Sequence, residues 1–157
     1  MIDIRVQQED FSVEAALAPL EALGGGAIAS FVGLVRGDDG VEALTLEHYP
    51  GMTEAALRRL AEAALDRWSL LGAAIVHRVG MLRRGERIVL VAACAAHRRD
   101  ALDACAYLID RLKTDAPFWK RETRAGQESW VDARAGDEAA AERWDHVGDS
   151  HRSSPRP

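Results

Sequence analysis

The chain has 157 residues and a mass of 17.1 kDa, the usual size of one domain and too little for two independent cores. Hydrophobic residues make up 48% and charged residues 29%, a balance typical of a globular protein and unlike a disordered chain or a fibre. The 20 Lys and Arg against 25 Asp and Glu give a net charge of −5, which argues against nucleic-acid binding through bulk charge.

No apolar run approaches the roughly 20 residues that a membrane-spanning helix needs. The first five residues lack the apolar stretch of a signal peptide. We therefore expect a cytoplasmic protein that does not associate with membranes.

The two cysteines, Cys94 and Cys105, are too few for a disulfide scaffold and match no zinc-binding spacing. We expect both to be buried apolar residues, and we predict no metal site.

The N-terminal segment predicts an edge strand and a short helix. Residues 2–6 alternate between apolar and polar side chains, as a half-buried strand does. Ser12 is suited to cap a helix that Pro19 interrupts before the glycines at 24–26.

Two β-rich runs, 27–35 and 42–49, follow these glycines. They flank residues 37–40, which are glycine and aspartate and tolerate the positive φ of a tight turn. We therefore predict that the two runs pair as a hairpin.

The middle of the chain alternates helical and β-rich patterns. The predicted elements are a helix over 53–68, strands over 73–79 and 87–96 joined by residues 80–86, and a helix over 99–113. The second of these strands is apolar on both faces, which places it at the centre of its sheet. Pro117 prevents the last helix from continuing.

The C-terminal segment predicts a late strand over 128–133 and an amphipathic helix over 137–144, with Trp144 as the last core anchor. Residues 145–157 are nearly devoid of apolar side chains, so we expect a disordered tail after a single domain over 1–144.

A basic tripeptide, His97-Arg98-Arg99, falls where the central strand leads into a helix. Backbone N–H groups at such a junction attract anions, and arginines there oppose the helix dipole unless an anion is bound. A second interpretation has Arg98 and Arg99 paired with Asp100 and Asp103 on a solvated face. The tripeptide alone does not decide between them.

The segment from Lys113 to Glu122 combines cations with aromatic side chains. Lys113 and Lys120 stand seven residues apart around Pro117, beside Phe118 and Trp119. This mixture suits a ligand that has a planar ring and a phosphate. The segment is equally consistent with a lysine at a helix C-terminus and aromatic rings that fill the core.

Lysine is the candidate for acid–base chemistry, because burial beside other cations lowers its pKa and yields a neutral amine. Arg36 ends the first strand of the predicted hairpin, directly after Leu34 and Val35, and taken alone it would be a turn arginine facing water. His48 and His77 lie in strand patterns, where a hydrogen-bonded structural histidine is commoner than a ligand.

Three ordered blocks of the sequence resemble the MoaE family, the large, catalytic subunits of molybdopterin synthase. The blocks are residues 43–53 (ALTLEHYPGMT), 96–98 (AHR), and 112–114 with 116–122 (LKT and APFWKRE). The resemblance spans roughly Phe11 to Trp144.

The resemblance implies an α+β domain of the α/β hammerhead type, with a mixed, mostly antiparallel sheet packed against helices. It also implies a homodimer that binds a small ubiquitin-like sulfur-carrier subunit at each end, as a heterotetramer. The carrier's C-terminal Gly-Gly thiocarboxylate would enter a pocket, where cyclic pyranopterin monophosphate receives two sulfurs to give the dithiolene of molybdopterin. The large subunit would need no cofactor.

Carried over by position, the resemblance implies that Lys113 and Lys120 are catalytic. The implied substrate-binding residues are Leu34, Val35, Arg36, His97, Arg98, Lys113, Lys120, Arg121 and Glu122. A lysine ammonium would stabilise the negative charge of a tetrahedral intermediate, and a neutral lysine could move protons. Which lysine takes which role stays open.

Two features separate this chain from a simple transfer of the family's properties: the loop after Arg36, and the segment after Trp144, which has no assigned counterpart in the family. The loop after Arg36, residues 37–40, is shorter than the family often has. A non-catalytic alternative is a dimeric adaptor that binds a carrier protein or a phosphorylated ring without transforming it.

Overall fold

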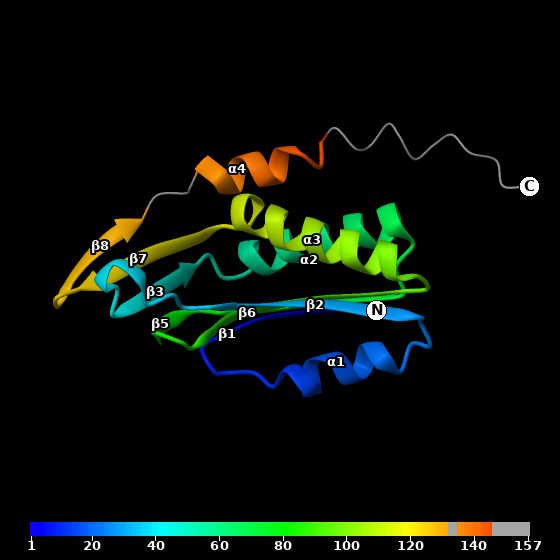
Figure 1. The fold of residues 1–157 in the computed structure, drawn as a ribbon, viewed down its shortest axis with the longest axis horizontal. Coiled ribbons are helices and arrows are strands. Elements are labelled where there is room, and N and C mark those ends of the chain that lie inside the picture. The colour runs from blue at the N-terminus through cyan, green and yellow to red at the C-terminus, as the bar shows by residue number, and fades with distance from the viewer. Residues whose placement is uncertain (132–134, 146–157) are drawn as a thin grey trace, which may run out of the picture.

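The computed structural model describes residues 1–131 and 135–145. Within these residues the chain forms two four-stranded sheets, four α-helices and a short 3-10 helix (Figure 1). This confirms an α+β fold, but with two sheets where the sequence suggested one.

The first sheet has the strand order β1-β4-β6-β2. Its strands are β1 (Ile2–Gln7), β4 (Gly72–Arg78), β6 (Arg87–Ala95) and β2 (Ala27–Leu34). Only β1 and β4 pair in parallel, and the other pairs of this sheet are antiparallel. The prediction of a mixed, mostly antiparallel arrangement with an N-terminal edge strand is therefore confirmed.

Helices cover both faces of the first sheet. On one face, Val91 and Ala93 of β6 pack with α2 (Met52–Trp68) and α3 (Arg98–Asp115). On the other face, Leu90 and Ala92 pack with α1 (Val13–Glu21). The two apolar faces of β6 thus fill two cores, which explains its central position.

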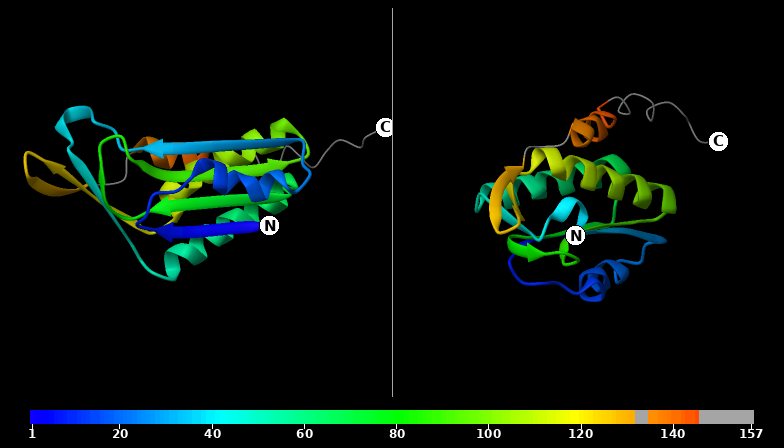
Figure 2. Two further views of the ribbon diagram at one scale, coloured as in Figure 1. Left: turned by 90° about the horizontal axis from the view of Figure 1, so that it is seen from below. Right: turned by 60° about the vertical axis from the view of Figure 1, so that its left-hand side comes forward.

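The second sheet lies at one end of the first (Figure 2) and has the order β5-β3-β7-β8. Its strands are β5 (Gly80–Arg83), β3 (Ala43–His48), β7 (Phe118–Arg124) and β8 (Gln127–Val131), all paired antiparallel.

The predicted hairpin is wrong, because β2 and β3 belong to different sheets. β2 pairs with β6, and β3 pairs with β5 and β7. Residues Asp38–Gly40 form the 3-10 helix between them. Local turn chemistry permits a hairpin, but β2 buries Ile28 and Ala29 on opposite faces only beside β6.

Three other elements also differ from the predictions. The stretch 80–86, predicted to link two strands, contains β5, and the segment after Pro117, where no strand was predicted, forms β7. Helix α1 continues through Pro19, which is exposed, because the buried side chains of Ala16 and Leu20 hold its last turn.

Helix α4 (Ala135–Glu142) lies over α3 and is anchored by Trp144. The Trp144 ring packs edge-on against Trp68 and Tyr107, with centroids 5.6 and 5.7 Å away. Its Nε1–H donates a hydrogen bond to an Asp110 carboxylate oxygen at 2.9 Å. The prediction of Trp144 as a core anchor is confirmed.

Residues 146–157 of the predicted tail lie outside the described residues. Among the helices that are described, none has the length and apolar character needed to span a membrane. Cys94 and Cys105 are buried free thiols, as predicted.

Candidate active site

A cavity of about 600 Å³ lies where the two sheets meet the C-terminal end of α3. Apolar side chains form much of its lining, including Phe31 of β2, Leu46 of β3 and Phe118 of β7. This volume is within the range that small-molecule sites use.

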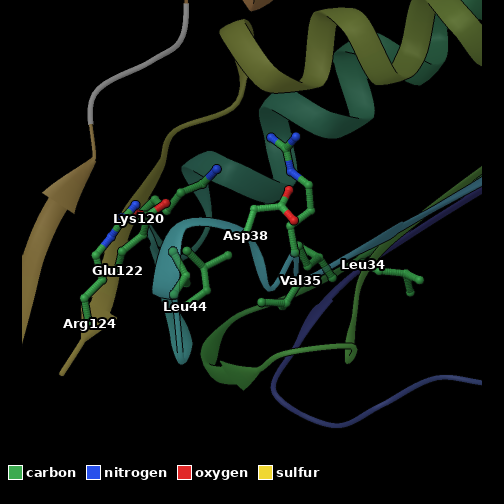
Figure 3. Close-up of a pocket in the computed structure, with 10 residues that line it drawn as sticks. Leu34, Val35, Asp38, Leu44, Lys120, Glu122 and Arg124 are labelled. Atoms are coloured by element: carbon green, nitrogen blue, oxygen red, sulfur yellow. The ribbon is translucent and has the colours of Figure 1, made fainter. Parts of the chain in front are cut away.

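A smaller hollow of about 150 Å³ continues from this cavity. The two share Leu34, Arg36, Leu44, Ile88 and Lys120. In Figure 3, Lys120, Glu122 and Arg124 line the wall formed by β7, while Val35 and Asp38 lie on the opposite wall. We refer to the two hollows together as the cationic cavity.

Three cations from distant segments converge on the larger hollow of the cationic cavity: Arg36, Lys113 and Lys120. Arg36 lies two residues after the end of β2. Lys113 is in the last turn of α3, and Lys120 is in β7. The fold therefore brings together the predicted cations of the first β-run, the α3 terminus and the Phe-Trp segment.

The chain contains two lysines among its 20 Lys and Arg residues, and both line this cavity. Every other basic residue in that total is an arginine, whose guanidinium does not lose its proton in proteins. The only side chains of the chain that can supply an amine base are thus the two in the cavity.

Two carboxylates of the cavity are paired with cations. Lys113 Nζ lies 3.7 Å from Asp137 Oδ1, and Arg124 Nη2 donates to Glu122 at 2.9 Å. Glu122, for which the resemblance implies substrate binding, lines the cavity, and its carboxylate is already engaged by Arg124.

His97 and Arg98 do not reach the cationic cavity of their own chain. His97 caps the start of α3, and Arg98, its first residue, is fifteen residues before Lys113, which corresponds to about 22 Å along the helix axis. Among the residues that the structure describes, no ion pair joins Arg98 or Arg99 to Asp100 or Asp103. The expected pairing with Asp100 and Asp103 is therefore not found, whereas Arg98 and Arg99 are exposed to solvent as that interpretation expects.

Arg121 lies on the opposite face of β7 from Lys120, because neighbouring strand residues point to opposite faces. Its guanidinium donates to Glu47 at 2.7 Å and to Glu128 at 3.1 Å, and it sits 5.1 Å from the centroid of the Trp130 ring. The structure thus separates Arg121 from the other predicted substrate-binding residues of this segment.

His77 of β4 also lines the cavity, although the sequence suggested only a structural role. Its ring is buried and stacks on Phe118 with centroids 3.8 Å apart, and Nδ1 lies 2.8 Å from the Arg78 carbonyl oxygen. The expected hydrogen bond is confirmed. No local pattern marks His77 as a cavity residue, because its placement depends on the meeting of the two sheets.

Comparison with known proteins identifies the relatives of the chain. The family model described as MoaE protein matches residues 6–115. The molybdopterin synthase catalytic subunit of Ralstonia nicotianae is 49% identical over 155 residues, which cover 96% of this chain and 88% of that protein.

Solved structures agree with this result. Molybdopterin cofactor biosynthesis protein E from Burkholderia multivorans is 52% identical with a TM-score of 0.80, covering 92% of this chain and 97% of that one. Molybdopterin synthase from Staphylococcus aureus is 30% identical with a TM-score of 0.72, covering 82% of this chain and 96% of that one. The match to the family model and the identity to these relatives show that the chain belongs to the MoaE family.

Proposed function

We propose that this chain is the catalytic subunit of a molybdopterin synthase. It transfers sulfur from the C-terminal thiocarboxylate of a small carrier protein to cyclic pyranopterin monophosphate and so forms the dithiolene of molybdopterin. The observation that carries the proposal is the convergence of Arg36, Lys113 and Lys120 on one cavity in a chain of this family.

The cavity offers groups that can bind a phosphate, apolar surface for a ring, and side chains for acid–base catalysis. A guanidinium and two amines supply charge-assisted hydrogen bonds to a phosphate. Phe31 and Phe118 supply apolar surface for the ring. Attack on the thiocarboxylate carbon develops negative charge, which an ammonium group stabilises. A neutral lysine takes up a proton and, once protonated, can give it back.

The sulfur donor is a second, ubiquitin-like protein that ends in Gly-Gly. The R. nicotianae relative is named a catalytic subunit, which is consistent with a separate partner subunit. An extended Gly-Gly terminus is narrow enough to enter a cavity that a folded domain cannot enter.

The site also includes His97 and Arg98 from a second copy of the chain, in a homodimer within a heterotetramer. Both residues are exposed, and the helix that separates them from Lys113 of the same chain prevents a direct contribution. A neighbouring copy can supply them without distorting α3. We further propose that the complex acts in the cytoplasm, since both cysteines are free thiols, as is usual in a reducing compartment.

The function is tested by mixing the chain with thiocarboxylated carrier and cyclic pyranopterin monophosphate. The dithiolene product is then measured as its oxidised fluorescent derivative. We expect product from the wild type, and a loss of at least about a hundredfold in Lys113→Ala and Lys120→Ala, the scale of lost acid–base catalysis. Arg59→Ala is the matched control, because Arg59 is an exposed cation on α2 outside the cavity.

Arginine substitutions separate the two roles of lysine. Lys→Arg keeps the positive charge and removes the ability to lose a proton. The lysine that stabilises the oxyanion should tolerate the change better than the lysine that moves protons. Ligand binding by the wild type without any product would instead support the adaptor function.

The shared site is tested by complementation. In a mixed dimer of Lys113→Ala and His97→Ala chains, one of the two shared sites contains no substitution. Random mixing should therefore restore about a quarter of the wild-type activity. No restoration, although mixed dimers form, would contradict a site that draws on both copies.

A further inference from the structure

His77 is buried, with 5% of its surface exposed, yet it borders the larger hollow of the cationic cavity. Its ring is fixed by two contacts. Phe118 stacks against one face at a centroid distance of 3.8 Å and an interplanar angle of 18°, and Nδ1 lies 2.8 Å from the Arg78 carbonyl oxygen. The imidazole therefore has one orientation rather than several.

The hydrogen bond at Nδ1 determines the tautomer of the neutral ring. A carbonyl oxygen only accepts, so Nδ1 carries the hydrogen and donates it. Nε2 is then the nitrogen with the lone pair, and it has no hydrogen-bond partner among the residues that the structure describes. His77, a residue of the cavity lining, thus carries an acceptor that the described residues leave unused.

The ring stays neutral under physiological conditions. Burial lowers the pKa of His77 to about 4, the hydrogen bond to Arg78 opposes this effect, and the positive charges of His48 and Lys120 lower the pKa further. A neutral imidazole keeps its Nε2 lone pair even beside the cations that hold an anionic ligand.

The larger hollow is otherwise short of side-chain acceptors for a ligand N–H group. Arg36 is a donor only, and Lys113 and Lys120 are donors only when they are protonated. Asp137 is the one carboxylate among its described lining residues, and it is already paired with Lys113. A bound ring with N–H groups would therefore meet mostly donor side chains, except at His77.

We propose that Nε2 of His77 accepts a hydrogen bond from a ring N–H of the bound pterin and so orients the ring in the cavity. This inference rests on the proposed function, because it takes a reduced pterin phosphate as the ligand. His77 would favour a ring that has an N–H group opposite Nε2 over a ring that has an acceptor atom in that position. The cations recognise the phosphate.

The test compares two substitutions. His77→Phe keeps a flat ring against Phe118 and removes the acceptor. His77→Gln places an amide oxygen near the position of Nε2 and so restores it. Calorimetry measures binding of cyclic pyranopterin monophosphate to the carrier-free protein, and inorganic phosphate is the control ligand because it lacks the ring.

We expect His77→Phe to weaken binding of the pterin about tenfold, which is the usual effect of one lost hydrogen bond to a neutral group. His77→Gln should recover most of that loss, and phosphate binding should be equal in all three proteins. In turnover, KM for the pterin should rise while kcat at saturation changes little.

Equal pterin binding by the wild type and His77→Phe would overturn the proposal. Equal losses of pterin and phosphate binding would also overturn it, because they would indicate a purely structural role. A wild type that binds no pterin would instead count against the proposed function.

A measurement on the wild type covers the case in which the phenylalanine variant does not fold. In protein labelled with ¹⁵N-histidine, the unprotonated Nε2 of His77 should move upfield when the pterin is added, because it accepts a hydrogen bond. Inorganic phosphate should not cause this shift. An unchanged Nε2 resonance with bound pterin would contradict the inference.

Discussion

Lys113 Nζ lies 3.7 Å from Asp137 Oδ1, and this ion pair joins the last turn of α3 to α4 at the rim of the cationic cavity. The two side chains are 49% and 30% exposed. Solvent screening at such exposure makes the pair a small contributor to stability. Its effect falls instead on the ability of Lys113 to bind an anion.

Asp137→Asn should strengthen the binding of inorganic phosphate about threefold at low ionic strength, within the range of exposed ion pairs. The reason is that the substitution removes a negative charge that competes with the anion for Lys113. The gain should shrink as salt is added, because salt screens the lost repulsion. Asp66→Asn, an exposed change on α2, is the control, and an equal gain there would contradict the explanation.

Trp144→Ala should lower the free energy of unfolding by about 3 kcal/mol, the scale of deleting a large, packed aromatic ring. The substitution removes the contacts with Trp68 and Tyr107 and the hydrogen bond to Asp110. Trp144→Phe keeps part of the ring packing and should lose less. Urea denaturation measures both, and a loss below about 0.5 kcal/mol for the alanine variant would show that α4 is not anchored by this ring.

The buried His77 should make the protein lose stability in acid. Its pKa is about 4 in the folded protein, against 6.5 for a histidine exposed to water, so the unfolded chain binds the proton more readily between these values. The contribution of His77 is therefore complete above about pH 6.5 and falls by about 3 kcal/mol as the pH approaches 4.

This dependence is measured as the difference between two proteins. The free energy of unfolding of the wild type should decline more steeply from pH 7 to pH 4.5 than that of His77→Phe, which has no group to protonate. Carboxylates contribute to both curves and cancel in the comparison. Parallel curves would contradict a neutral, buried His77.

Cys105 should resist alkylation in the folded protein. Burial raises the pKa of its thiol to about 11 from 9.0, and Sγ is directed to the Val91 carbonyl oxygen at 3.8 Å. At pH 8 only about one thiol in a thousand is then the reactive thiolate. Mass spectrometry after iodoacetamide treatment should find Cys105 labelled only after unfolding, and rapid labelling of the native chain would refute this prediction.

Much of the first sheet could be predicted from the sequence, since its signals are local. The continuous apolar run of β6 predicts a strand that is buried on both faces, and the helical spacing of apolar residues in α2 predicts the helix that covers one face of the sheet. The pairing of β2 could not be predicted in this way. Residues 37–40 have hairpin composition, but the partner of a strand is decided by which neighbours cover its two faces.

The candidate site is predictable only in part. The family resemblance selects the cations Arg36, Lys113 and Lys120, and the fold brings them to one cavity. The same resemblance groups Arg121 with Lys120 by position. In β7 these neighbours point to opposite faces, and of the two it is Lys120 that lines the cavity, so closeness in the sequence does not decide which side chains share a cavity.

The continuous helix α3 carries Arg98 at one end and Lys113 at the other. Each residue of an α-helix advances the chain by about 1.5 Å and turns it by about 100°. Deleting one residue anywhere between these ends would swing one functional terminus about a quarter of a circle around the axis relative to the other. We therefore expect α3 to accept many exchanges on its exposed side but no insertion or deletion, so that its length is as much a part of the enzyme as its side chains.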